Sequence, residues 1–288
     1  MLTQMTDLLG CSIGATDGIV GTVTDLFFDD TAWVIRYLVV KTGSWLSSRH
    51  VLISPASLSD IPRRSNVLPA DLTMRAVKDS PLIDTDRPVS MQHEMEYLRY
   101  YGYALYWSGG NLWGRGAHPG SLRTTAAQEN ADDAPGAWAL DDARADREAD
   151  AAHRPRSDHH LRSCETVLVY RVECPDGDLG HVHGFLLEDE TWAIRYLIVN
   201  TSNWWLGGHD VLIAPQWIEA VSWDANKVIV KLRRDQVKSA PPYSHTRPFD
   251  RDQELKFHEH YAQLPYWARE VKYENPEMQG GGGRPPLF

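Results

Sequence analysis

WAIRYLIV, at residues 192–199, is the stretch that decides the fold, because the chain contains it twice. Its twin is WVIRYLVV, at residues 33–40. Both stretches are rich in β-branched and aromatic residues, which favour β-strands. Each follows an acidic turn, at residues 29–30 or 188–190, and another strand-like run precedes the turn. Each copy is therefore predicted to contain a β-hairpin with an arginine in its second strand.

The repeat extends well beyond this strand. Residues 17–42 align with residues 176–201 without a gap, and 12 of these 26 positions are identical. After one extra residue in the second copy, the match resumes and runs to Tyr106-Trp107, which aligns with Tyr266-Trp267. Two copies of about a hundred residues are longer than the units of solenoid proteins. We therefore predict tandem domains, each with a core of its own.

The repeat also sets the predicted domain boundaries. The first domain covers residues 1–107 and the second covers residues 161–270. Residues 108–160 begin with glycine pairs and continue into a run rich in Ala, Asp and Arg, which predicts a flexible acidic linker. Residues 271–288 contain four consecutive glycines and are predicted to form a flexible tail. Within the linker, Trp113 and Trp138 are the positions expected to dock onto a domain.

The hydropathy pattern predicts a mostly β fold with short helices: two tandem small antiparallel β-barrels, each followed by a C-terminal helix. Residues 33–42 are apolar on both faces of the predicted strand, which indicates a strand covered on both sides. A closed barrel with an element packed outside it satisfies that requirement. Residues 91–101 have apolar positions at helical spacing, and Ser90 is the predicted N-cap of this helix.

Composition narrows the class of protein. The hydrophobic content of 42% is ordinary for a soluble globular chain. No apolar run approaches the roughly 20 residues of a membrane-spanning helix, and the N-terminus is not expected to be a secretory signal. The expected location is the cytoplasm, either free or peripheral to the inner membrane. Three cysteines do not form a disulfide framework. The net charge of −10, without a basic cluster, argues against nucleic-acid binding.

Several motifs of the two copies carry a family resemblance. The residues concerned are Asp17-Gly18, Gly21, Val23 and residues 33–37 in the first copy, and Asp176-Gly177, Gly180, Val182 and residues 192–196 in the second. With them, each copy resembles the PRC-barrel family, named for the cytoplasmic domain of the H-type protein of the photosynthetic reaction centre. The block from Arg87-Pro88 to Tyr106-Trp107 is similar to bacterial proteins with two such copies. The resemblance covers about three quarters of the chain.

The resemblance implies small PRC-type barrels of five or six strands and a role in interactions rather than catalysis. In the photosynthetic reaction centre, the H-type protein caps the membrane core and shapes proton delivery to the quinone. A related barrel in a ribosome maturation factor binds a ribosomal protein. The N-terminal membrane helix of the H-type protein is not matched in this sequence, so a stable place in a reaction centre is not expected.

Two kinds of residue are candidates for partner binding. Arg36 and Arg195 lie among apolar residues of the predicted strands, and a buried guanidinium needs an acidic or carbonyl partner. We expect Glu94 and Glu254, on the helices that cover the barrels, to be those partners, with a docking contact as the alternative. The tryptophans of the matching loops are Trp45, Trp204 and Trp205. Exposed tryptophans are frequent binding hot spots, and the alternative is that they close one end of each barrel.

Metal and catalytic sites are not expected. His181 and His183 are two residues apart on a strand, so they share a face, but no carboxylate or cysteine has ligand spacing nearby. The acidic turns at residues 29–30 and 188–190 lack the oxygen pattern of a calcium loop. No catalytic motif stands out, so no catalytic residue, metal ligand or cofactor is assigned.

The function expected from the sequence is that of a non-catalytic protein-interaction or assembly module. Its expected partner is a protein, and a photosynthetic or electron-transport membrane complex is favoured by the resemblance. One alternative is an accessory factor for ribosome or RNA processing. Another is a small-molecule binding protein or hydrolase with a pocket between the barrels. Nucleic-acid binding and direct membrane insertion are not expected, and the oligomeric state is left open.

Overall fold

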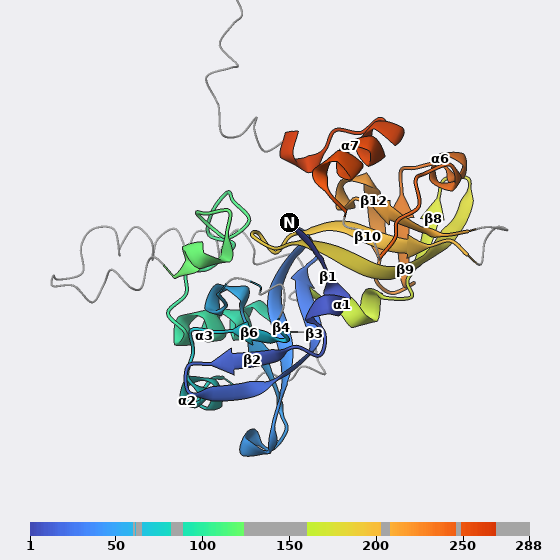
Figure 1. The fold of residues 1–288 in the computed structure, drawn as a ribbon. Coiled ribbons are helices and arrows are strands. Elements are labelled where there is room, and N and C mark those ends of the chain that lie inside the picture. Colours follow the sequence, from blue (N-terminus) through green and yellow to red (C-terminus); the bar gives the residue numbers. More distant parts are fainter. Residues whose placement is uncertain are drawn as a thin grey trace, which may run out of the picture.

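A computed structural model describes residues 1–59, 61, 65–81, 89–123, 160–202, 208–245 and 249–268 of the 288-residue chain. Its framework is two β-sheets (Figure 1). The first sheet runs in the order β5-β4-β3-β2-β6, and the second in the order β11-β10-β9-β8-β13-β12. The first contains β2 (Ser12–Ala15), β3 (Gly18–Asp29), β4 (Val34–Thr42), β5 (His50–Ile53) and β6 (Val67–Pro69). The second contains β8 (Arg171–Cys174), β9 (Gly177–Glu188), β10 (Ile194–Asn200), β11 (Asp210–Ile213), β12 (Ile218–Ser222) and β13 (Lys227–Val230).

The mostly β class is confirmed, but closed antiparallel barrels are not observed. In the described residues neither sheet closes, since no ladder joins its two edge strands. In addition, β6 pairs with β2 in parallel, and β13 pairs with β8 in parallel. The physical reason is the path of the chain after β5 and β11. A 3-10 helix, η2 (Pro55–Ser57) or η4 (Pro215–Trp217), follows each of these strands, and the next strands join the opposite edge of the sheet.

The first half of the chain is taken as residues 1–123 and the second half as residues 160–268. Each half gives its first strand to the sheet of the other half. Strand β1 (Leu2–Gln4) pairs with β9, so that Leu2 faces Glu188. Strand β7 (Leu161–Ser163) pairs with β3, so that Leu161 faces Asp29. These two registers are equivalent in the repeat, in which position 2 matches 161 and position 29 matches 188. The two halves are therefore related by approximate twofold symmetry and are interleaved at their edges.

The two halves also meet at the start of their central strands. Val34 and Ala193, which are equivalent in the repeat, form an isolated antiparallel bridge. The amide of Ile35 donates to the carbonyl of Trp192 over 2.9 Å, and the amide of Ile194 donates to the carbonyl of Trp33 over 2.7 Å. This reciprocal pair of bonds lies where an approximate twofold axis relates the two hairpins.

Both repeat tryptophans precede their strands instead of opening them. Trp33 and Trp192 have φ angles of 55° and 57°, in the left-handed region that bulky side chains rarely adopt. That conformation turns each carbonyl toward the other half, where it accepts the cross-half bond. Trp192 is buried and Trp33 is partly buried against the core, stacked on Phe28 at 5.2 Å.

An additional anchor fixes the segment after β7 to the first half. Asp25 of β3 accepts a hydrogen bond from the Ser163 hydroxyl over 2.5 Å and one from the Glu165 amide over 3.0 Å. The Glu165 amide belongs to the first turn of α5 (Cys164–Val167). The repeat places Gly184 where Asp25 stands, so this contact has no twin.

Short helices cover the sheets. They are α1 (Met5–Leu8), α2 (Met74–Lys78), α3 (Met91–Tyr100), α5, α6 (Arg234–Lys238) and α7 (Arg251–His260), with η1 (Ser44–Leu46) and η3 (Pro119–Leu122) as single 3-10 turns. The predicted N-cap of α3 is confirmed, because the Ser90 hydroxyl accepts from the His93 amide. Helix α3 packs Tyr97 into the first half, where its hydroxyl donates to the Leu52 carbonyl over 3.1 Å. No helix in the described ranges is long and apolar enough to span a bilayer.

Residues 108–123, expected to open a flexible linker, pack against the folded halves instead. Trp113 is 1% exposed, and its indole N–H donates to the Thr191 carbonyl of the second half over 2.8 Å. Arg123 donates to the Leu58 carbonyl over 3.0 Å. The indole of Trp113 and the guanidinium of Arg123 thus hold residues 108–123 in place, although the glycines of this segment predict a flexible linker. Trp138, residues 124–159 and the tail lie outside the described residues, and the domain boundaries remain a prediction.

We predict that cutting the chain between its halves will not separate them. A protease site placed within residues 124–159 leaves β1, β7 and the Val34–Ala193 bridge intact, since all three lie outside that segment. After cleavage, the two fragments are expected to co-elute in gel filtration at the size of the uncut chain and to melt in one transition. The matched control is a site within residues 269–288. Separate elution of the two fragments would contradict the interleaved arrangement.

Candidate interaction surfaces

Arg36 of β4 is buried in a polar site at the centre of the first half. Its side chain is 3% exposed, and its guanidinium forms an ion pair with Asp29 over 3.0 Å. A second donor of Arg36 reaches the Leu112 carbonyl over 2.6 Å. The guanidinium also lies over the rings of Tyr106 and Trp113, at 3.9 and 4.8 Å from their centroids. The Arg36 guanidinium is therefore engaged within the protein.

The second half repeats this site around Arg195. Its Nε donates to Glu188 over 3.0 Å, and its guanidinium lies 3.9 Å from the centroid of the Tyr266 ring. Glu188 is the repeat equivalent of Asp29, and Tyr266 is the equivalent of Tyr106. Arginine, acid and tyrosine thus form one unit that occurs in both halves.

The prediction that Glu94 and Glu254 are the acidic partners of the two arginines is wrong. The partner acid closes the strand before the turn, seven residues ahead of the arginine, and a hairpin brings those two positions together. Glu94 and Glu254 are buried and have other partners. The Tyr106 hydroxyl donates to Glu94 over 2.7 Å, and Arg251 pairs with Glu254 over 3.1 Å.

The ion pairs set the charge state of the two turn acids. Burial alone would raise the pKa of Asp29, but the charge and hydrogen bond of Arg36, with two backbone amides, hold that pKa below its usual range. Burial would likewise raise the pKa of Glu188, but the charge of Arg195 and the hydroxyl of Thr191 hold that pKa below its usual range. Both acids are therefore ionised at neutral pH.

The pKa of Glu94 is shifted in the opposite direction, upward. It is fully buried on α3, and burial raises its pKa to about 8, although hydrogen bonds from Tyr106 and Tyr37 oppose the rise. His160 lies next to it, with Nε2 3.1 Å from the Glu94 carboxylate and 2.7 Å from the Tyr106 hydroxyl. Since His160 leads into the exchanged strand β7, this polar cluster joins α3 to the other half.

A cleft of about 320 Å³ lies beside the junction of the halves. Its lining includes Trp33 and Leu112 from the first half and Ala193, Arg195 and Pro215 from the second. Among the described residues of this lining, Arg195 is the only ionisable side chain, and it is already paired with Glu188. The cleft is thus a groove with both polar and apolar groups in its lining.

The outer face of β3, β2 and β6 is uncharged. It presents Ser12, Gly14, Ile19, Val67 and Pro69, which we call the uncharged outer face. Ile19 and Val67 are 52% and 37% exposed. They lie on either side of Gly14, because Ile19 faces Gly14 across the ladder and a Cβ at Gly14 would lie 2.8 Å from Val67.

The matching face of the second half is charged. Four of the five equivalent positions are charged, namely Arg171, Glu173, Asp178 and Lys227, and the fifth is Ile229. Lys227 forms an ion pair with Glu173 over 2.6 Å. Comparing the two copies residue by residue would have shown this difference in the sequence.

The loop tryptophans had been predicted as binding residues or barrel plugs. Trp45 lies on η1, is half-buried, and donates its indole N–H to the carbonyl of Val20 over 2.9 Å. Because Val20 follows Ile19, this indole is anchored next to the strand that carries the uncharged outer face. Trp204 and Trp205 lie outside the described residues.

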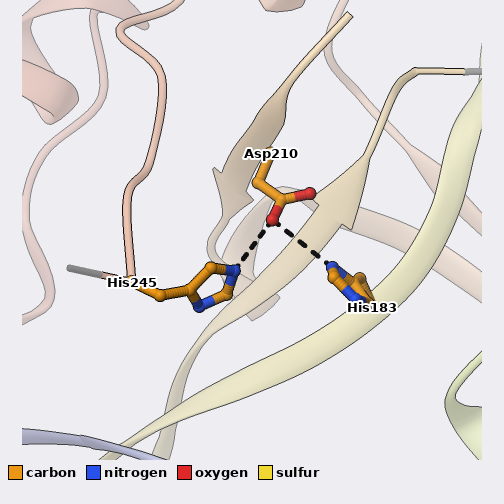
Figure 2. A group of neighbouring side chains, drawn as sticks. All are labelled: His183, Asp210 and His245. Atoms are coloured by element: carbon orange, nitrogen blue, oxygen red, sulfur yellow. Dashed lines mark hydrogen bonds and ion pairs between the residues drawn. The ribbon is translucent and has the colours of Figure 1, made fainter.

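A third group of side chains gathers at the edge of the second sheet. Two histidines, His183 of β9 and His245, converge on one carboxylate oxygen of Asp210 of β11 (Figure 2). No carboxylate had been expected near His183, because Asp210 and His245 are remote in the sequence and reach it only through strand pairing and the return of the chain. His181, the other half of the predicted histidine pair, is not part of this group; its ring centroid lies 6.4 Å from that of His183.

Comparison with known families identifies residues 4–69 as a PRC-barrel domain. The match runs from the end of β1 to β6 and so includes the first sheet and the uncharged outer face. No curated protein matches the chain. The resemblance of the second half to the first therefore rests on the internal repeat and on its equivalent strand order.

We predict that the Arg36–Asp29 pair is a major source of stability. Asp29→Ala leaves a buried guanidinium without its counter-ion, which typically costs about 3–5 kcal/mol. Asp29→Asn is expected to cost less, because it retains an acceptor for the Thr31 and Ala32 amides that Asp29 binds now. The measurement is urea unfolding. Asp79→Ala, which removes an exposed pair with Arg75, is the control and should cost less than about 1 kcal/mol. A similar small cost for Asp29→Ala would contradict the prediction.

We also predict a pH dependence that comes from Glu94. Its pKa rises from 4.5 in the unfolded chain to about 8 in the folded protein, so the folded state binds more protons between these values. Stability should therefore fall as pH rises through this window. One unit of pKa corresponds to about 1.4 kcal/mol, so Glu94→Gln should reduce the fall in unfolding free energy by more than about 1 kcal/mol.

The control for this measurement is Glu96→Gln, an exposed position on the same helix, which should leave the pH profile unchanged. Unfolding free energies between pH 5 and pH 8.5 for the three proteins provide the test. Parallel profiles for wild type and Glu94→Gln would show that Glu94 is not the titrating group.

Proposed function

We propose that this protein is a non-catalytic protein-interaction module of the PRC-barrel type, and that the uncharged outer face of its first half binds the partner. The observation that carries the proposal is the difference between two equivalent faces on one scaffold. The second half shows that the fold accepts Asp178 and Lys227 where the first half exposes Ile19 and Val67. Exposed apolar residues that the fold does not need favour a binding role.

The edge of the first sheet indicates how a partner would dock. Strand β6 ends in Pro69, which has no amide hydrogen to give to an added strand. Docking would therefore use side chains on the face of the sheet and not the addition of a strand at its edge. Trp45, which is bonded to the Val20 carbonyl of the same strand, would add aromatic contact area.

A non-catalytic role is supported by the lining of the junction cleft. Acid–base catalysis needs at least one group that gives or takes a proton near the reacting atom. The described side chains around this cleft offer Arg195 as their one ionisable group, and its charge is balanced by Glu188. A small-molecule binding role for the cleft remains the second candidate, because its volume of about 320 Å³ falls at the lower end of ligand sites.

The partner we propose is a protein of a photosynthetic or electron-transport membrane complex, with the chain at its cytoplasmic side. This choice rests on the resemblance to the H-type protein of the reaction centre and on a face with apolar side chains. The arginine units support it only indirectly, since Arg36 and Arg195 are engaged internally and hold the scaffold. An accessory role in ribosome or RNA processing is less favoured, because a net charge of −10 repels phosphate backbones.

The test exchanges the uncharged outer face for its own equivalent. Ile19→Asp with Val67→Lys introduces the residues that the second half carries, so folding should be preserved. Affinity capture from native cells with the wild-type chain, followed by mass spectrometry, provides the partner. The double variant is expected to lose that partner, while its melting temperature stays near the wild-type value.

The control is Leu264→Asp, which adds a charge at a residue that is 59% exposed and outside this face. It should capture the partner as the wild type does. Equal capture by the double variant, or equal loss in the control, would rule out the uncharged outer face as the binding surface.

A further inference from the structure

Three side chains from separate elements converge at the edge of the second sheet. His183 comes from β9, Asp210 opens β11, and His245 follows the segment after α6 (Figure 2). Nδ1 of His183 lies 3.3 Å from Oδ2 of Asp210, and Nε2 of His245 lies 2.9 Å from the same oxygen. The three ligand-type atoms all lie within 4.8 Å of one another. Both histidines are exposed, so the group is open to solvent.

The surroundings orient each of these groups toward a common point. The other oxygen of Asp210 accepts a hydrogen bond from the Asn200 side chain over 2.7 Å, which leaves Oδ2 for the histidines. Nδ1 of His245 lies 2.9 Å from the side-chain oxygen of Gln4. In metal sites, a ligating histidine usually gives its second nitrogen to such a carbonyl, and a ligating carboxylate is itself held by hydrogen bonds.

We propose that His183, Asp210 and His245 form a binding site for a divalent zinc-class ion. Two imidazole nitrogens and one carboxylate oxygen are a common zinc donor set, and a solvent molecule takes the fourth position. Tetrahedral bonds of about 2.0–2.2 Å place ligand atoms about 3.3–3.5 Å apart. The two nitrogen–oxygen separations of 2.9 and 3.3 Å are close to this spacing, and the two histidine nitrogens lie within 4.8 Å of each other, so side-chain adjustment would bring the three groups around the ion.

This site belongs to the second half alone and reaches the first through Gln4. Position 183 corresponds to Thr24 and position 210 to His50, so the first half does not repeat the donor set. Gln4 lies on the exchanged strand β1, which pairs with β9, the strand that carries His183. A bound ion would thus hold β1 to the second sheet through the Gln4–His245 contact. The proposal does not depend on the uncharged outer face.

The test uses the full-length, untagged chain after treatment with a chelator and dialysis. Isothermal titration with Zn²⁺ should show one ion per chain, and Mg²⁺, which prefers all-oxygen sites, should show none. Asp210→Asn and His245→Ala should each weaken Zn²⁺ binding by more than the roughly 10–100-fold typical of outer contacts. Gln4→Ala, which removes such an outer contact, should fall within that range.

The matched control is His50→Ala, which removes an exposed histidine at the position equivalent to Asp210 in the first half. It should bind Zn²⁺ as the wild type does. A melting scan of each ion-free variant establishes folding, and the near-isosteric Asp210→Asn keeps the test valid if His245→Ala unfolds. Absence of saturable one-to-one binding, or unchanged binding in folded Asp210→Asn, would overturn the proposal.

Discussion

Two backbone hydrogen bonds, exchanged between Ile35 and Trp192 and between Ile194 and Trp33, fix how the halves of this protein meet. Each bond depends on a tryptophan held in a left-handed backbone conformation, which is costly for a bulky residue. Packing around both rings offsets that cost. From this junction, the first strand of each half reaches the sheet of the other. The two sheets therefore share edges, and neither half has its full set of strands without its neighbour.

Each buried arginine beside the junction has its charge balanced within its own half. Arg36 and Arg195 each come one residue after the amide that donates the cross-half bond, and each pairs with the acid that precedes the turn. A tyrosine stacks on each guanidinium, and Trp113 lies over Arg36 while donating to Thr191 of the other half. The polar interior of one half is thus closed by a segment that also contacts the second.

In this duplicated scaffold, the residues that determine the fold and the residues on the outer faces have changed to different extents. The arginine, its stacked tyrosine and an acid before the turn recur in both copies, whereas the outer faces have diverged. The first copy exposes Ile19 and Val67, and the second has an ion pair and the His183–Asp210–His245 group. Because the inner positions are equivalent, each copy serves as a natural control for the other. The proposed partner surface and the proposed metal site therefore lie on opposite copies.

The hairpins, the mostly β class and the capped helix α3 could be predicted from the sequence, because they follow from local periodicity and turn chemistry. The exchange of β1 and β7 could not, since strands of three residues carry no signal for which sheet they join. The acid partner of each arginine lies seven residues before it, a separation that hairpin geometry brings into contact and that the sequence could have indicated. The His183 site depends on contacts across 27 and 35 residues, which no local pattern encodes. Likewise, the packing of residues 108–123 depends on Trp113 finding the Thr191 carbonyl, 78 positions away.

Hydrogen exchange at the amides of Ile35 and Ile194 tests the central claim most directly. If the halves meet as described, both amides are buried donors in cross-half bonds. They should then exchange only through global unfolding, as slowly as the most protected amides of β3 and β4. Fast exchange of these two amides, in a chain whose sheets remain protected, would show that the halves fold without the junction and would contradict the account.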